Sequence, residues 1–304
     1  MPNSQKKTFR IPFFSSLFDK LIENKSSLAV YLVIVALVLF TIGHNMYKGA
    51  WNYVTAASLA FLMLLIPAAV KVILRIHLTP VLEILAYVFV FSSEILGEVH
   101  NFYGRFPFWD GVLHVISGVM FAAFAFCLAD VFNKSKKSRF LLSPLFLALF
   151  AFCFSMTVGV VWEFIEFTGD TLLKTDMQKD YIIDNVHTVY YINYGGESNV
   201  SHYNGIASSV YYDAAGNPIV SFPGVLDIGI IDTIKDMALN TLGAVLFCII
   251  GYLNIRRGGK GRFANLLIPV YVGVTENNTR DSSEGTADPC ESPPDTRKAK
   301  GLTQ

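Results

Sequence analysis

The chain has few cysteines and little charge. Four of its 304 residues are cysteine, and Asp, Glu, Lys and Arg together make up 16%. We expect Cys127, Cys153 and Cys248 inside apolar segments and Cys290 in the C-terminal tail, so no pair remains for a disulfide outside the membrane. The sequence also lacks a nucleotide-binding loop, a nucleophile elbow and a cysteine-rich metal motif. The functions that those motifs mark are therefore unsupported, and we expect no nucleic-acid partner.

Long apolar runs are what the chain has instead. Hydrophobic residues make up 53% of it, gathered in runs of roughly 17 to 25 residues, the length that crosses a bilayer. We predict an all-α integral membrane protein, a bundle of six transmembrane helices near residues 28–46, 52–74, 80–101, 109–132, 140–167 and 228–253. The first run is long and lacks a small-residue cleavage site, so we expect it to remain as an anchor.

Basic residues predict how the bundle is oriented. Clusters of Lys and Arg precede the first predicted span and follow the second, fourth and sixth: Lys6 to Lys25, Lys71 and Arg75, Lys134 to Arg139, and Arg256 to Arg262. The opposite side carries only Lys48, Arg105, Lys174 and Lys179. Because cytoplasmic loops are enriched in Lys and Arg, we predict that both termini are cytoplasmic.

The chain divides into five predicted regions. Residues 1–26 form a cytoplasmic amphipathic segment, 27–170 hold the first five transmembrane helices, 171–226 form an extracytoplasmic Tyr-rich loop, 227–254 form the sixth helix, and 255–304 form a basic tail. Alternating β-formers around Gly and Asn predict one or two β-hairpins in the loop. The loop is either a lid over a site or a decoration without a role. From about residue 275 the tail is almost free of apolar residues, so we expect disorder there.

Ionisable side chains inside the predicted spans are the main functional signal, because such groups are costly in a membrane and usually serve a function. They share helix faces, and the predicted topology puts most of them within roughly 15 Å of the outer interface. The ionisable residues are Glu94, Glu98, Asp110, His114, Glu163, Glu166, Asp170, Asp232 and Asp236, with His44 as a further contributor, and the neutral polar Asn240 belongs to the same set. Glu83 shares the stripe of Glu94 and Glu98 but lies near the inner end.

These carboxylates need a neutralising partner, since one acidic residue at a helix centre costs about 2.5–3.5 kcal/mol. Protonation, Lys235, Arg105, His114 or a bound cation could supply it, and clustered carboxylates with one histidine favour Mn, Fe or Zn. We predict Asp110, His114, Glu163 and Asp236 as metal ligands, Glu166 and Asp232 as catalytic groups, and Glu94, Glu98, Asp170 and Asn240 as further polar lining.

Simpler interpretations exist for single members of this set. Asp110 follows Pro107 and could cap a helix N-terminus. Asp170 could be a solvated residue at a helix exit, and Lys235 could pair locally with Asp232. Hydrogen bonding between helices explains any one pair. It explains the whole set less well, because two or three partners suffice to hold helices together.

Three segments carry a resemblance to a known family. FWDGVLHVISG, WEFIEFTGDTL followed by DMQ, and DTIKDMALNTLGA resemble the YjdF-like bacterial inner-membrane proteins, and the Asp-x-x-x-Asn-x-x-Gly pattern of the last helix is more remotely similar to VanZ-like proteins. The resemblance covers roughly residues 108–250 and implies a helical membrane protein, with no reaction attached. The long Tyr-rich insertion between Gln178 and Asp232 departs from the expected shorter connection.

Three functions remain open from the sequence. The first is a divalent-metal-dependent membrane enzyme that acts at the outer leaflet on a lipid or lipid-linked envelope substrate. The second is a proton- or cation-coupled transporter, although Glu83 is the lone acidic group near the inner end and no internal repeat is evident. The third is a scaffold whose outer loop binds a partner. Membrane lipids are the expected surroundings, and the oligomeric state is open.

Overall fold

The protein is described here from a computed structural model, which places residues 12–74, 76, 78–134, 143–189, 200–257 and 261–268. Within these ranges six helical segments are long and apolar enough to cross a membrane: Lys25–Lys48, Trp51–Leu74, Pro80–Val99, Trp109–Phe126, Pro144–Leu173 and Ile230–Arg256. The predicted six-helix membrane fold is therefore confirmed. The predicted disordered tail from residue 275 lies outside the described residues.

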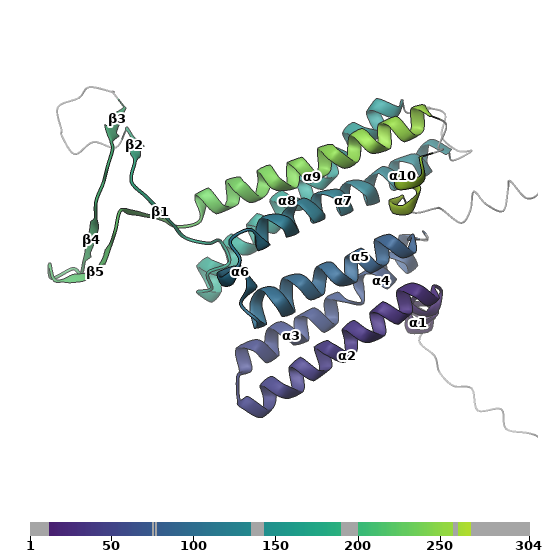
Figure 1. Cartoon of the computed structure of the whole chain (residues 1–304), viewed down its shortest axis with the longest axis horizontal. Coiled ribbons are helices and arrows are strands. Elements are labelled where there is room, and N and C mark those ends of the chain that lie inside the picture. The colour runs from purple at the N-terminus through teal and green to yellow at the C-terminus, as the bar shows by residue number, and fades with distance from the viewer. Residues whose placement is uncertain are drawn as a thin grey trace, which may run out of the picture.

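The helices form two groups that lie side by side (Figure 1). The first group contains α2 (Lys25–Lys48), α3 (Trp51–Met63), α4 (Ile66–Leu74), and α5 (Pro80–Val90) with its π-helical continuation η1 (Phe91–Val99). The second contains α7 (Trp109–Lys134), α9 (Ile230–Arg256), and α8 (Pro144–Thr168) with its π-helical continuation η2 (Gly169–Leu173). Each group has its own apolar core. Contacts of α5 and η1 with α7 join the two groups.

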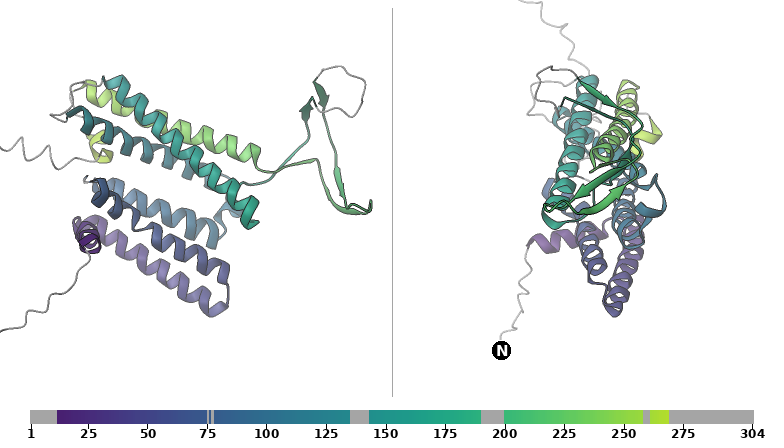
Figure 2. Two further views of the ribbon diagram at one scale, coloured as in Figure 1. Left: turned by 180° about the vertical axis from the view of Figure 1, so that it is seen from behind. Right: turned by 90° about the vertical axis from the view of Figure 1, so that its left-hand side faces the viewer.

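Three short helices complete the helical part. At one end of the bundle α1 (Pro12–Ile22) packs on α4, and α10 (Arg262–Leu267) packs on α5 and α9. We call this the terminal end. At the other end α6 (Phe102–Arg105) connects η1 to α7, and the chain leaves the bundle after η2 and returns to it at α9. We call this the loop end, and both views in Figure 2 show the strands there.

Local sequence explains where two of the membrane helices begin. Thr79 and Ser143 precede Pro80 and Pro144, and their hydroxyl oxygens accept hydrogen bonds from backbone N–H groups three residues later, at 3.3 and 3.2 Å. A capping hydroxyl followed by proline in the first turn is a strong helix start. The opposite ends of both helices widen into π-turns, a geometry often found at functional sites.

The strands of the loop form three antiparallel pairs among the described residues. β1 (Tyr181–Ile183) pairs with β6 (Val225–Asp227), β2 (Val186–Thr188) with β3 (Ser201–Tyr203), and β4 (Ser209–Tyr212) with β5 (Pro218–Phe222). The sequence predicted one or two hairpins and missed the first pair, because β1 and β6 are far apart in the chain and no turn links them. β2 to β5 extend away from the helices (Figure 1).

Glycine lets α7 and α9 cross at backbone contact. A Cβ atom added at Gly243 would lie 2.1 Å from the Val115 carbonyl oxygen, and one at Gly118 would lie 2.2 Å from the Asn240 carbonyl oxygen. Real Cβ atoms do not approach so closely, so only glycine fits either position. This crossing brings the polar residues of α7 and α9 together.

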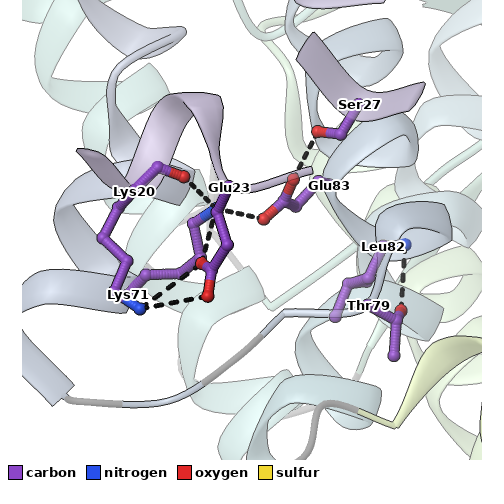
Figure 3. Close-up of polar contacts among 7 residues, drawn as sticks. All are labelled: Lys20, Glu23, Ser27, Lys71, Thr79, Leu82 and Glu83. Carbon is purple, nitrogen blue, oxygen red and sulfur yellow. Dashed lines mark hydrogen bonds and ion pairs between the residues drawn. The ribbon is translucent and has the colours of Figure 1, made fainter. Parts of the chain in front are cut away.

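A buried ion pair ties the first group together at the terminal end (Figure 3). The Lys71 ammonium of α4 contacts the Glu83 carboxylate of α5, and both side chains are at most 2% exposed. The same ammonium donates to the Lys20 carbonyl oxygen of α1 at 2.5 Å, and Ser27 of α2 donates to Glu83. Glu83 therefore serves in this network and does not continue the stripe of Glu94 and Glu98.

Candidate functional site

Three predicted metal ligands meet where α7 and α9 cross. The donor atoms of Asp110, His114 and Asp236 all lie within 4.8 Å of one another. His114 Nε2 is 3.5 Å from Asp110 Oδ1 and 3.7 Å from Asp236 Oδ2. Asp110 and His114 are one helical turn apart on α7, so they share a face. Asp236 reaches the same point from α9.

The geometry of this cluster fits a divalent ion. Metal bonds to nitrogen and carboxylate oxygen are about 2.0–2.2 Å long, so two ligands of one ion lie at most about 4.4 Å apart. To bind one ion, the three donor atoms would need to come only slightly closer to one another. Asp236 Oδ2 is buried and has no hydrogen-bond partner, and such an oxygen is costly unless a proton or a cation meets it. One imidazole with two carboxylates suits Mn, Fe or Zn.

A cavity of about 190 Å³ opens beside the cluster, between the two helix groups. His114 and Asp110 line it from α7, and Glu166 lines it from α8. Trp162 Nε1 donates a 2.8 Å hydrogen bond to Glu166 Oε1 and fixes that carboxylate one turn along the same helix. A predicted catalytic carboxylate and two predicted ligands thus face one space.

Tyr103 is a site residue that the sequence analysis missed. It is the second residue of α6, in the connection between η1 and α7. No periodic sequence pattern there predicts a site residue. Burial, and then the charges of Asp110, Glu94, Glu98 and Glu166, raise the pKa of its hydroxyl well above the ordinary value. Tyr103 is therefore a neutral hydrogen-bond donor among four carboxylates. Its ring packs on Gly97 of η1, where any Cβ atom would overlap it.

Glu163 and Asp232, two further predicted site residues, lie near the cluster but outside it. Glu163 is buried on α8, and its Oε2 has no hydrogen-bond partner. Asp232 is buried on α9, and its Oδ2 accepts a 2.7 Å hydrogen bond from the Lys179 backbone N–H. Neither belongs to the three-residue cluster among the described residues. Asp232 is thus positioned to hold the chain that leaves η2.

Asp170, predicted as site lining, anchors the segment that follows η2. Its carboxylate accepts hydrogen bonds from the Thr175 hydroxyl at 2.8 Å and from the backbone N–H groups of Met177 and Gln178 at 2.6 and 2.9 Å. Together with Asp232 it fixes residues 175–179 against the bundle. This segment, and not the distant hairpins, borders the site at the loop end.

We expect Asp170→Ala to loosen this segment. Hydrogen bonds to a charged group contribute about 1.5–3 kcal/mol each, and local opening controls cleavage in the native state. Trypsin should therefore cut after Lys174 or Lys179 at least about tenfold faster than in the wild type, the factor that 1.4 kcal/mol represents. Asp176→Ala is the control, since Asp176 is exposed in the same segment. Equal cleavage of both variants would contradict the anchoring role.

The remaining predicted residues occupy three different places. Asn240 is buried where α7, α8 and α9 meet, accepts from the Ser117 hydroxyl at 3.2 Å and donates to the Ser155 carbonyl at 3.4 Å, which is the helix-joining role considered above. Glu94 and Glu98 line a second, wider cleft. His44 stacks on Phe40 on an exposed face of α2 and lines neither the cavity nor this cleft.

Comparison with known proteins supports the membrane assignment. Residues 27–257 match the family described as "Predicted membrane protein (DUF2238)". The chain is also similar to a protein of Thermotoga maritima described as uncharacterised, with 34% identity over 84 residues, 28% of this chain and 41% of that protein. The chain thus spans less than half the length of this relative. No solved structure matches it.

Proposed function

The chain belongs to the DUF2238 family of predicted membrane proteins, and from that premise we propose a divalent-metal-dependent membrane enzyme that acts on a lipid or lipid-linked envelope substrate. Membership confirms the coarse part of the predicted resemblance, a family of membrane proteins. The narrower likeness to YjdF-like and VanZ-like proteins stays a prediction.

The observation that carries the proposal is the Asp110, His114 and Asp236 cluster beside a cavity at membrane depth. Its donors are within 4.8 Å of one another, and one of them, Asp236 Oδ2, is buried without a hydrogen bond. Buried side-chain oxygens in a structural network usually have a hydrogen-bond partner. A cation bound by the three side chains would satisfy it.

The chain's own residues support hydrolysis or group transfer. A bound divalent ion would act as a Lewis acid on a phosphoryl or carbonyl oxygen and would lower the pKa of a bound water. Glu166, fixed by Trp162 and facing the cavity, is placed to take or deliver a proton. Tyr103, which also lines the cavity, adds a neutral donor. We assign Asp232 a positioning role, because one of its oxygens already holds Lys179.

Transport is less well supported than catalysis. A proton path needs a chain of titratable groups across the membrane. Glu83, the acidic residue expected to continue such a path toward the terminal end, is bound to Lys71 and Ser27. Because Glu83 is held in this ion pair, the described residues do not extend the acidic site toward the terminal end.

The orientation of the bundle belongs to this proposal. Lys20, Lys25 and Lys71 lie at the terminal end, and cytoplasmic flanks are enriched in Lys and Arg. The loop end, with the cluster and the strands, would then face away from the cytoplasm. The substrate would come from the outer leaflet of a bacterial inner membrane.

Metal analysis of the purified protein tests the proposal directly. We expect about one equivalent of Mn, Fe or Zn in the wild type by mass spectrometry. Both His114→Ala and Asp236→Asn should be nearly metal-free, because the first removes a ligand and the second replaces a charged oxygen ligand with a neutral, weaker one. Glu163→Gln reports on whether the fourth predicted ligand contributes.

Asp19→Asn is the matched control, since Asp19 is exposed on α1 at the terminal end. It should keep the wild-type metal content. A wild type that is folded and free of metal after incubation with each ion, or variants at both positions that keep the metal, would overturn the proposal.

A further inference from the structure

A second cleft, of about 950 Å³, adjoins the metal cluster. It lies between α3 and the C-terminal half of α8. Met63, Tyr103, Asp110 and Glu166 line both this cleft and the smaller cavity. A molecule in the cleft would therefore have one end next to the metal cluster. The cleft is large enough for part of a lipid, whereas the smaller cavity is not.

The walls of this cleft are apolar and exposed. From α3 they include Leu59, which is 50% exposed, and from α8 they include Phe164 and Ile165, which are 65% and 50% exposed. Both helices are membrane-spanning segments, so exposed side chains on them face lipid. The cleft thus opens laterally, toward the bilayer. Acyl chains could lie along it without leaving the hydrocarbon core of the membrane.

The polar part of the cleft is strongly negative. Glu94 and Glu98 line it from η1; Glu94 has a 3.5 Å contact with the Ser93 hydroxyl, and no described side chain forms an ion pair with Glu98. Lys179 lies at the mouth, but its ammonium contacts the Asp176 carbonyl oxygen and lies 5.9 Å from the centre of the Tyr103 ring. Lys179 thus forms no ion pair with Glu94 or Glu98, although all three line the cleft.

We propose that the cleft binds a phospholipid with a primary-amine headgroup, which enters sideways between α3 and α8. The apolar walls take the acyl chains, and charge complementarity places the ammonium against Glu94 and Glu98. The phosphate then lies toward Asp110, His114 and Asp236, where a divalent ion offsets the charge of the carboxylates. The last step rests on the proposed function, whereas lateral binding of the amine lipid does not.

The test is binding of short-chain phospholipids to the purified full chain in detergent, with phosphatidylethanolamine compared with phosphatidylglycerol. Leu59→Trp narrows the cleft, while Leu62→Trp is the matched control, because Leu62 is 61% exposed on the same helix and does not line the cleft. Glu94→Gln with Glu98→Gln removes the headgroup charges. Metal content is measured on the same samples.

We expect the wild type to bind phosphatidylethanolamine at least about tenfold more tightly than phosphatidylglycerol, the factor expected for a 1.4 kcal/mol charge preference. Leu59→Trp should lose most of this binding and Leu62→Trp should keep it, while the double Gln variant should keep binding but lose the preference. Equal binding by the two Trp variants, or a preference for the anionic lipid, would overturn the inference. Lipid binding by a metal-free wild type would instead contradict only the proposed function.

Discussion

Lys71→Met should lower the free energy of unfolding by about 3–5 kcal/mol, the typical cost of breaking a buried ion pair by removing one partner. The loss leaves the Glu83 carboxylate, at most 2% exposed, without its cation. It also removes the donor to the Lys20 carbonyl, which joins α1 to the bundle. Unfolding in mixed micelles with increasing denaturing detergent measures the change.

A second variant separates charge burial from packing. In Lys71→Met with Glu83→Met both charges are gone, so most of the loss should be recovered. Lys20→Met is the control: its 3.2 Å ion pair with Glu23 is about one-third exposed, and exposed pairs contribute at most about 1 kcal/mol. A double variant as unstable as Lys71→Met would show that packing, and not the unpaired charge, causes the loss.

Gly243→Ala should destabilise the protein by about 1–3 kcal/mol, the usual cost of overpacking. Its Cβ would lie 2.1 Å from the Val115 carbonyl oxygen, so α7 and α9 must move apart. Alanine favours a helix over glycine by about 1 kcal/mol, but backbone overlap outweighs that gain. The shift also separates His114 from Asp236, so metal affinity should fall even though no ligand is changed.

Gly43→Ala is the matched control for this variant. Gly43 also lies inside a membrane helix, α2, but a Cβ atom there meets nothing within 4 Å. Stability and metal content should therefore stay at or slightly above the wild-type level. If both alanine variants behave alike, the close crossing of α7 and α9 does not position the site.

Part of the candidate site follows from local geometry, and the sequence predicts that part well. Asp110 and His114 are four residues apart on one predicted helix, so their shared face is fixed by the helical repeat alone. Asp236 joins them because the topology puts the starts of α7 and α9 at one end of the bundle. The sequence predicted the correct end of the bundle for Glu94 and Glu98. It did not predict that they line the wider cleft, because the helices packed around η1 determine which space these side chains face.

Other residues took roles that no local pattern reveals. Tyr103 is in a connection without periodicity, and it became a site residue only because η1 and α7 close around it. Asp170 and Asp232 were predicted as site groups, but they accept backbone hydrogen bonds from residues 177–179. Partners of this kind depend on how the chain returns to the bundle, which the composition of the loop does not encode.

The sequence by itself determined the six membrane-spanning helices, because apolar runs of bilayer length can satisfy their backbone polar groups in lipid only as helices. It also determined which ionisable and polar residues would need a partner there. Only the tertiary structure decided which residues are those partners. Glu83 pairs with Lys71, and Asn240 accepts a hydrogen bond from Ser117. Asp236 Oδ2 lies 3.7 Å from His114 Nε2 and has no hydrogen-bond partner. The physical reason is that helix spacing sets a side chain's direction, whereas helix packing sets what it meets.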